Sequence, residues 1–156
     1  KFGISPFSVW RNKDKDERGS NTKAGQTNYD DLYADILLWL EKGWIDYVAP
    51  QLYLEIGHDK IDYKTMLYWW AKNSYGRHVY IGHGIYRVNE RSLAWKNPNE
   101  LPNQIKLLRK SENIHGSIYF SSKTFDNNPN GWNDSLRNNY YKVPALIPEM
   151  PWLNDR

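Results

Sequence analysis

The sequence predicts an α/β fold: half of a (β/α)8 TIM-type barrel, made of about four parallel strand–helix units. Four apolar runs begin near residues 2, 45, 79 and 115, and a polar loop and a helical pattern follow each run. Strands that alternate with helices are typical of a parallel sheet. The chain has 156 residues, whereas a complete barrel takes at least about 200. Because the first run starts without a cap or linker before it, we expect the C-terminal half of a barrel.

The first unit joins a strand at residues 2–7 to a helix through a long polar loop, residues 10–26. A single helix is expected from near Asn28 to Gly43, because two acidic residues occupy its first turn and glycine often ends a helix. Its apolar stripe runs from Leu32 to Leu40.

Three shorter units follow. The strand at 44–53 leads to a helix that starts near Asp62, and the strand at 78–82 leads to a helix announced by Asn97-Pro98-Asn99-Glu100. The strand at 114–120 leads to a short helix around 132–141. We therefore expect residues 1–142 to form the half-barrel and residues 143–156 to be a proline-rich, extended exit segment.

The composition excludes several classes of function. The formal charge is only +3, from 21 basic and 18 acidic residues, and there is no dense Lys/Arg run. We expect no nucleic-acid partner and no direct membrane insertion. The chain has no cysteine, which excludes disulfides, thiolate catalysis and cysteine-bound zinc. Nothing in the sequence predicts a metal site or a cofactor.

Aromatic residues are unusually frequent. Eight Trp, twelve Tyr and four Phe make up 15% of the chain, and many lie in loops beside Asn, Ser and Arg. An aromatic ring can stack on the apolar face of a sugar while polar side chains bind its hydroxyls, so these loops favour carbohydrate recognition. The alternative is that the rings pack the helices onto the sheet.

The second strand ends in a polar series. Gln51, Tyr53 and Glu55 alternate at period two, so in an extended chain they point to the same side. The carboxyl ends of barrel strands form the active site. We expect Gln51 and Tyr53 to bind substrate, and Glu55 to act as a catalytic acid or base or to bind a sugar hydroxyl. The alternative for Glu55 is a solvated loop residue.

The other strand ends add further candidates. The substrate-binding residues predicted there are Trp10, Arg11, Asn12, His83, Tyr86, Arg87, Ser121 and Lys123. Each strand end thereby supplies a ring, a cation or a hydroxyl to one face, which favours a carbohydrate cleft. A structural role is the alternative for His83. Its neighbours Gly82 and Gly84 indicate a close approach of backbone or ligand.

Four segments also carry a family resemblance: Phe2-Gly3-Ile4-Ser5-Pro6-Phe7 with Trp10-Arg11-Asn12, Trp44-Ile45-Asp46-Tyr47-Val48-Ala49-Pro50-Gln51-Leu52-Tyr53, Tyr80-Ile81-Gly82-His83-Gly84-Ile85-Tyr86, and Gly116-Ser117-Ile118-Tyr119-Phe120-Ser121-Ser122. They resemble the C-terminal half of glycosyl-hydrolase-like family 10. This is a bacterial group of (β/α)8 proteins, often lipoproteins or secreted, associated with cell-wall or polysaccharide glycans. The resemblance implies glycoside hydrolysis by the parent protein and a periplasmic, cell-surface or secreted location.

Two functions follow from these observations. In the first, the chain is part of a glycoside hydrolase and contributes one wall of its cleft. Because glycoside hydrolysis usually needs two carboxylates, a partner for Glu55 would come from the missing N-terminal half of the barrel or from a second copy of the chain. The fragment alone would then be inactive or weakly active. The alternative function is a non-catalytic glycan-binding module.

Overall fold

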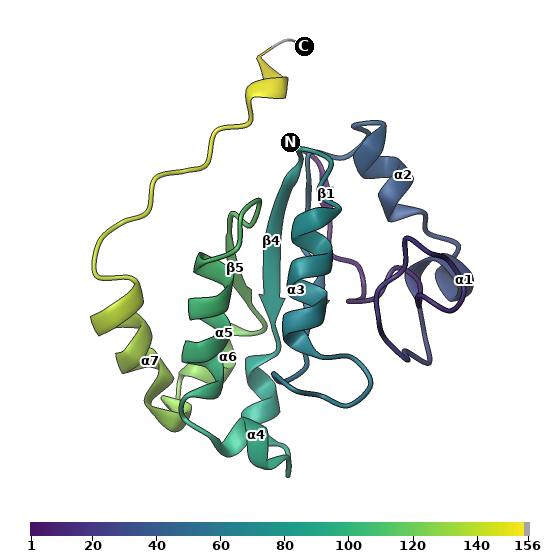
Figure 1. Cartoon of the computed structure of the whole chain (residues 1–156). Coiled ribbons are helices and arrows are strands. Elements are labelled where there is room, and N and C mark those ends of the chain that lie inside the picture. Colours follow the sequence, from purple (N-terminus) through teal and green to yellow (C-terminus); the bar gives the residue numbers. More distant parts are fainter. Residues whose placement is uncertain (155–156) are drawn as a thin grey trace.

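A computed structural model describes residues 1–154 of the chain and shows an α/β fold around a parallel sheet, as predicted (Figure 1). The strands are β1 (Gly3–Ile4), β2 (Tyr47–Val48), β3 (Gln51–Leu52), β4 (His78–His83) and β5 (Gly116–Tyr119). The α-helices are α1 (Asn28–Leu32), α2 (Ile36–Glu41), α3 (Tyr63–Lys72), α4 (Leu93–Lys96), α5 (Glu100–Arg109), α6 (Ser122–Phe125) and α7 (Trp132–Ser135). Shorter helical turns are η1 (Ile85–Asn89), η2 (Pro129–Gly131), η3 (Leu136–Tyr140) and η4 (Pro151–Leu153).

The strands β2 and β3 are two parts of one line of the sheet. Both pair with the same strand, β4, and their register is constant: Tyr47 lies opposite His78, and Gln51 lies opposite Gly82. The interruption falls at Pro50, whose carbonyl still accepts a hydrogen bond of 2.9 Å from the Gly82 amide. With β1 on one side and β5 beside β4, the sheet has the strand sequence expected of part of a TIM-type barrel.

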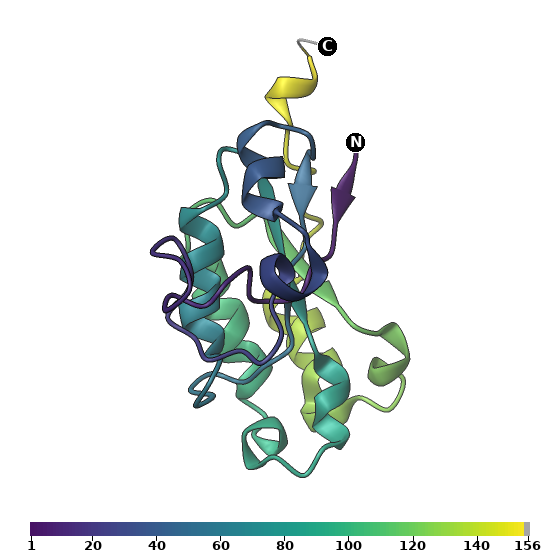
Figure 2. The ribbon, with the colours of Figure 1, turned by 90° about the vertical axis from the view of Figure 1, so that its right-hand side faces the viewer.

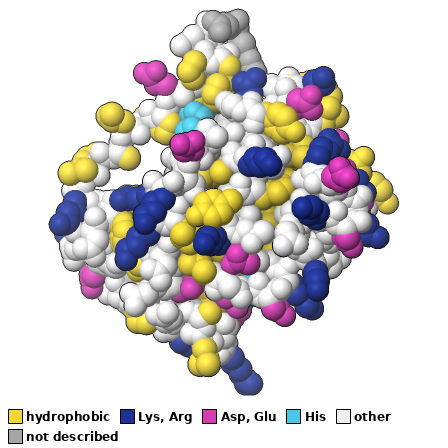
Figure 3. Space-filling model, in the orientation of Figure 1, with side chains coloured by type: hydrophobic (Ala, Val, Ile, Leu, Met, Phe, Trp, Pro, Cys, Tyr) yellow, Lys and Arg dark blue, Asp and Glu magenta, His cyan; other side chains and the backbone are white. Residues whose placement is uncertain are grey.

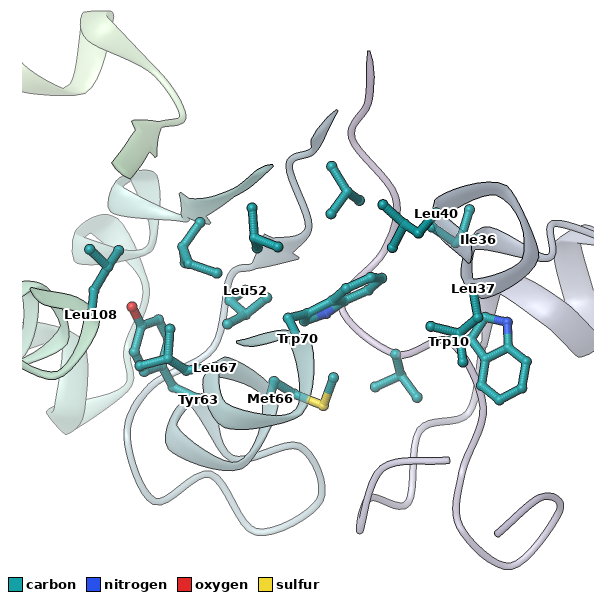
Figure 4. Close-up of a cluster of buried hydrophobic side chains, with 14 of the residues drawn as sticks. Trp10, Ile36, Leu37, Leu40, Leu52, Tyr63, Met66, Leu67, Trp70 and Leu108 are labelled. Carbon is teal, nitrogen blue, oxygen red and sulfur yellow. The ribbon is translucent and has the colours of Figure 1, made fainter. Parts of the chain in front are cut away.

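Helices cover one face of this sheet and enclose the main core (Figures 1 and 4). The helix α3 begins at its N-cap Asp62, whose Oδ2 accepts a hydrogen bond of 2.8 Å from the Thr65 amide. Its residues Leu67 and Trp70 are fully buried against the sheet residues Leu52 and Ile81. The Trp70 indole also donates a 2.8 Å hydrogen bond to the Ser8 carbonyl, which ties α3 to the segment after β1.

A second apolar cluster supports the carboxyl ends of β4 and β5. It joins η1, α4, α5 and α7, with Trp95, Leu101 and Trp132 fully buried in it. The Trp132 indole donates a 2.9 Å hydrogen bond to the Pro98 carbonyl. The predicted start of the third long helix near Asn97–Glu100 is confirmed, since α5 begins at Glu100.

The expected single helix after the first loop is wrong, because the structure divides it into α1 and α2. The break occurs at Tyr33, which takes a left-handed backbone conformation with φ of 54°. Asp35 then caps α2 by accepting a 3.2 Å hydrogen bond from the Leu38 amide. The break leaves Leu32 exposed while Leu40 remains buried.

The segment after residue 142 is extended and then returns to the body of the molecule. Residues 143–150 stand off as an arm, with open space visible between arm and body (Figure 3). The indole of Trp152 donates a 3.1 Å hydrogen bond to Asp46 and its ring meets the His78 ring at 5.0 Å. Trp152 therefore packs where β2 and β4 begin, at the end of the sheet opposite the carboxyl ends of the strands (Figure 2).

Replacing Trp70 should test the main core. We expect Trp70→Ala to lower the free energy of unfolding by about 3–5 kcal/mol, because it leaves a large cavity and an unpaired Ser8 carbonyl. The matched control is Trp44→Ala, since Trp44 is 63% exposed and its loss should cost below about 1 kcal/mol. Urea unfolding of both variants measures the difference, and equal losses would contradict this account of the core.

Candidate functional site

A cavity of about 660 Å³ lies at the carboxyl ends of β1, β3 and β4. Its walls combine aromatic rings with hydrogen-bonding side chains. The lining residues are Ser5, Phe7, Ser8, Gly25, Gln26, Gln51, Tyr53, Leu54, Ile61, Tyr86, Arg87 and Phe120. Of the predicted site residues, the structure therefore brings together Gln51, Tyr53, Tyr86 and Arg87.

Three rings form the aromatic wall of the cavity. The ring of Tyr53 stacks on Phe120 at a centroid distance of 5.9 Å and an angle of 23°. Tyr86 meets both rings edge-on, at 5.9 Å from Tyr53 and 6.0 Å from Phe120. Such edge-to-face contacts hold each ring in a defined orientation. Burial raises the pKa of Tyr53 above its usual value, so its phenol stays protonated at neutral pH.

Two glycines make room for the central ring. A Cβ atom on Gly84 would come within 2.7 Å of the Tyr53 Cβ, and one on Gly82 would lie 3.0 Å from the Pro50 carbonyl oxygen and 3.2 Å from the Tyr53 ring. Real side chains do not tolerate contacts as short as the first. The close approach that the Gly82–Gly84 spacing predicted is therefore present, with Tyr53 as the approaching group.

The polar wall is supplied by Gln51 and Arg87. The Gln51 amide nitrogen donates a 3.0 Å hydrogen bond to the Ser5 carbonyl, and within residues 1–154 its Oε1 accepts none. Arg87 donates from Nη1 to Glu90 at 2.8 Å, while its buried Nε has no partner among the described residues. The cavity thus offers an amide acceptor and guanidinium donors beside the rings, which suits a sugar with hydroxyl groups.

Glu55 does not line this cavity, contrary to the position expected from period two. The strand stops at Leu52 and the chain bends at Leu54, so the alternation that places Gln51 and Tyr53 ends before Glu55. The Glu55 Oε2 accepts a 3.1 Å hydrogen bond from the buried indole of Trp95. Its carboxylate is therefore held against the second apolar cluster and not against the rings.

His83 also points away from the cavity, so the alternative structural role describes it. It is fully buried between the rings of Tyr63 and Tyr119, with centroid distances of 5.9 and 5.3 Å. Its Nδ1 lies 2.9 Å from the Gln104 amide oxygen and its Nε2 lies 3.1 Å from the Ser117 hydroxyl. Burial lowers the pKa of His83 to about 4, which keeps the imidazole neutral.

The three candidates after β1 have structural positions instead of positions in the cavity. Trp10 is fully buried and stacks on Trp69 at 6.3 Å. Arg11 makes a two-point ion pair with Asp30, with its shortest bond at 2.8 Å. Asn12 forms hydrogen bonds with Thr22 and Ala24 through both the nitrogen and the oxygen of its side-chain amide. A β-bridge and these polar contacts fold the loop back on itself, which buries Trp10 and holds Arg11 at the surface beside Asp30.

Ser121 and Lys123 line a separate cavity of about 340 Å³ that also includes Asn127. Tyr86 lines both this cavity and the main one, whereas Ser121 and Lys123 do not line the main one.

Sequence reasoning missed Phe120, the third ring of the aromatic wall, and two further residues that line the cavity, Phe7 and Gln26. Both phenylalanines lie at the end of an apolar run predicted as a strand, where a ring is usually attributed to the core. Their exposure, 41% for Phe7 and 55% for Phe120, shows that they are surface residues in this chain. The alternation of side chains along β5 could have indicated this position. Phe120 points to the same side of the strand as the half-exposed Ile118, whereas Tyr119 points to the opposite, more buried side.

A comparison with known protein families shows to which family the chain is related. The family model described as Glycosyl hydrolase-like 10 matches residues 1–99. The chain belongs to this family. That membership confirms the resemblance derived from the strand segments and agrees with a parallel α/β sheet that forms part of a TIM-type barrel.

Named relatives are similar over most of the chain. Glycosyl hydrolase YngK of Bacillus subtilis is 48% identical over 158 aligned residues, covering 99% of this chain and 31% of YngK. Glycosyl hydrolase DigH of Escherichia coli K12 is 38% identical over 128 residues, covering 76% of this chain and 29% of DigH. DigH of Shigella flexneri matches to the same extent. The chain thus spans about a third of the length of these relatives.

The buried imidazole generates a pH prediction. Because the folded-state pKa of His83 is about 4 and that of a free imidazole is about 6.5, the unfolded chain binds this proton first as the pH falls. The contribution of His83 to stability is complete above pH 6.5, and up to about 3 kcal/mol of it is lost as the pH falls to about 4. Urea unfolding at pH 7.5 and pH 4.5 should show a smaller loss for His83→Gln than for the natural chain. Equal losses in both proteins would contradict a depressed pKa at this position.

Proposed function

We propose that this chain forms one wall of the substrate cleft of a glycoside hydrolase that acts on cell-wall or other polysaccharide glycans. The observation that carries the proposal is the cavity at the carboxyl ends of the strands, with its Tyr53–Tyr86–Phe120 rings and adjacent polar groups. Barrel enzymes place their active sites at this end. Membership of the Glycosyl hydrolase-like 10 family supports the reaction class.

In the proposed complex, the rings bind the apolar faces of the sugars. The amide oxygen of Gln51 accepts a hydrogen bond from a sugar hydroxyl, and the guanidinium of Arg87 donates to another. Since the Gln51 Oε1 has no partner within the described residues and Arg87 is held by its Nη1 bond to Glu90, the wall is organised before the glycan arrives. Preorganised polar groups of this kind fix the orientation of a ligand.

The catalytic carboxylates are proposed to come from outside this wall. Among the described residues that line the cavity there is no Asp or Glu, whereas glycoside hydrolysis usually needs two carboxylates about 5 to 9.5 Å apart. We propose that they belong to the other half of the barrel, or to a second copy of the chain that takes its place. The 156-residue chain alone is then inactive or weakly active.

The lack of a carboxylate in this wall also supports the second candidate, a glycan-binding module without chemistry. The two candidates differ in what the complete protein does with a bound glycan. Release of reducing ends by the full-length protein supports the hydrolase, whereas binding without release supports the module. Action on cell-wall glycans would require a periplasmic, cell-surface or secreted location, which fractionation of the source cells tests.

Tyr86 provides the first test of the cleft. We expect Tyr86→Ala to weaken binding of polysaccharide fragments about 10-fold to 100-fold, because it removes a ring that the sugar would otherwise cover. Tyr86→Phe keeps the ring and should bind almost as well as the natural chain. The matched control is Tyr68→Ala, since Tyr68 is a 45% exposed tyrosine on α3 that lies outside the cavity. Calorimetric titration measures the affinities, and unchanged binding by Tyr86→Ala would refute this cleft.

Glu55 provides a test of the catalytic assignment. In the full-length protein we expect Glu55→Gln to keep hydrolysis within about threefold of the natural rate, because the Gln amide oxygen can still accept from Trp95. Loss of a true acid or base would cost 10²–10⁴-fold. Reducing-end assays compare the variant, the natural full-length protein and the 156-residue chain alone. A loss of a hundredfold or more would return Glu55 to the catalytic role.

A further inference from the structure

We propose that a second, lysine-lined cavity beside the aromatic one binds the anionic groups of an acidic polysaccharide. This cavity measures about 600 Å³ and lies between the loop after β1 and the loop after β3. Its charged lining consists of Lys13, Lys15, Lys23 and Lys60 with Asp14 and Asp59. The inference rests on the proposed function, because it concerns a continuation of the same cleft.

The walls of this lysine cavity are held in place by hydrogen bonds. Asn12 donates from its amide nitrogen to the Ala24 carbonyl at 2.9 Å and accepts from the Ala24 amide at 2.9 Å. The Thr22 hydroxyl donates to the same Asn12 oxygen at 2.8 Å. The Lys23 amide donates to the Lys60 carbonyl at 2.8 Å, which joins the two loops directly. The lysine side chains therefore extend from backbone segments whose positions are fixed by hydrogen bonds.

The charge in this cavity is not neutralised within the described part of the chain. Four lysines face two aspartates, and none of the ion pairs found in residues 1–154 includes a lysine side chain. Arg11 and Arg18 on the same loop are different, because both are paired with acidic residues. The four ammonium groups are thus available for anions from solution.

The lysine cavity and the aromatic cavity are lined by adjacent residues of the same two loops. Ala24 and Lys60 line the former, while their sequence neighbours Gly25 and Ile61 line the latter. Among the described residues that line the aromatic cavity, the charged one is Arg87, which is also a cation. A polymer that lies on the rings and extends along these loops therefore meets positive charge at successive positions.

These features favour, as the ligand, a glycan that carries carboxylates or phosphates along its length. A neutral glycan could accept hydrogen bonds from the lysines but would lack the attraction between opposite charges. Nucleic acid is a poorer fit, because the chain as a whole carries a formal charge of only +3 and the lysine cavity also contains two carboxylates. Exposed charges attract such a polymer through water, so the attraction weakens as salt is added.

The experiment compares one polymer with and without its charge. Oligogalacturonides carry one carboxylate on each sugar, and their methyl esters keep the same backbone without the charge. Calorimetric titration of the full chain uses both, and a glycerol-phosphate polymer distinguishes phosphate from carboxylate. The variant replaces Lys13, Lys15, Lys23 and Lys60 with Gln. The matched control makes the same change to Gln at four exposed lysines outside the cavity: Lys42, Lys72, Lys106 and Lys110.

We expect the cavity variant to bind at least one of the two anionic polymers tenfold or more weakly at low salt, with the methyl ester unaffected. The control variant should stay within about twofold. The proposal is overturned if neither anionic polymer binds more tightly than the ester, or if both variants lose affinity equally. Tyr86→Ala separates the two proposals. If it leaves binding unchanged while the lysine variant weakens it, the aromatic cleft is wrong and the anionic site remains.

Discussion

The fit of the Tyr53 ring against the end of β4 is the contact on which the candidate cleft depends. Gly82 and Gly84 have no side chains, and any Cβ at Gly84 would collide with Tyr53. The Gly82 amide is at the same time bonded to the Pro50 carbonyl, so β3 and β4 are held in register at this point. Once Tyr53 is seated, Phe120 stacks on it and Tyr86 contacts both edge-on. Three strand ends are thereby coupled through one ring.

Behind this wall, a buried polar network fixes the backbone that carries it. Gln104 on α5 bonds the His83 ring with its amide oxygen and donates from its nitrogen to Glu100 and to the Leu54 carbonyl. Since the Gln104 oxygen can only accept, His83 donates from Nδ1 and its Nε2 is free to accept from Ser117. Both ring nitrogens of His83 and both side-chain polar atoms of Gln104 have partners, which is the condition for a buried network to stabilise a fold. The backbone of Leu54, at the bend that ends the cleft wall, is therefore fixed by the hydrogen bond from Gln104 on α5.

The strand order and the strand ends were predictable from the sequence because apolar runs and helix signals recur along it. The direction of individual side chains was predictable only where the strand continues. His83 shares its parity with Val79 and Ile81, both fully buried, so parity alone assigns it to the core. Glu55 was misplaced because the bend at Leu54 has no clear signal in the residue types. The positions of Trp10 and Arg11 depend on contacts with Trp69 and Asp30, which are distant in sequence and were not foreseeable locally.

The parity of the strands separates the polar residues at the strand ends into two groups with different roles. Side chains on the helix-facing side of the strands, such as the buried His83 and the partly buried Ser117, bond to each other and contribute to stability. Side chains on the opposite parity, such as Gln51 and Tyr53, face the cavity and retain unused hydrogen-bonding atoms. Within the described residues, the second group contains rings, an amide and a guanidinium but no carboxylate. Under the proposed function, a wall of this chemistry binds and orients the glycan, and a proton donor for hydrolysis approaches from the opposite side of the cleft.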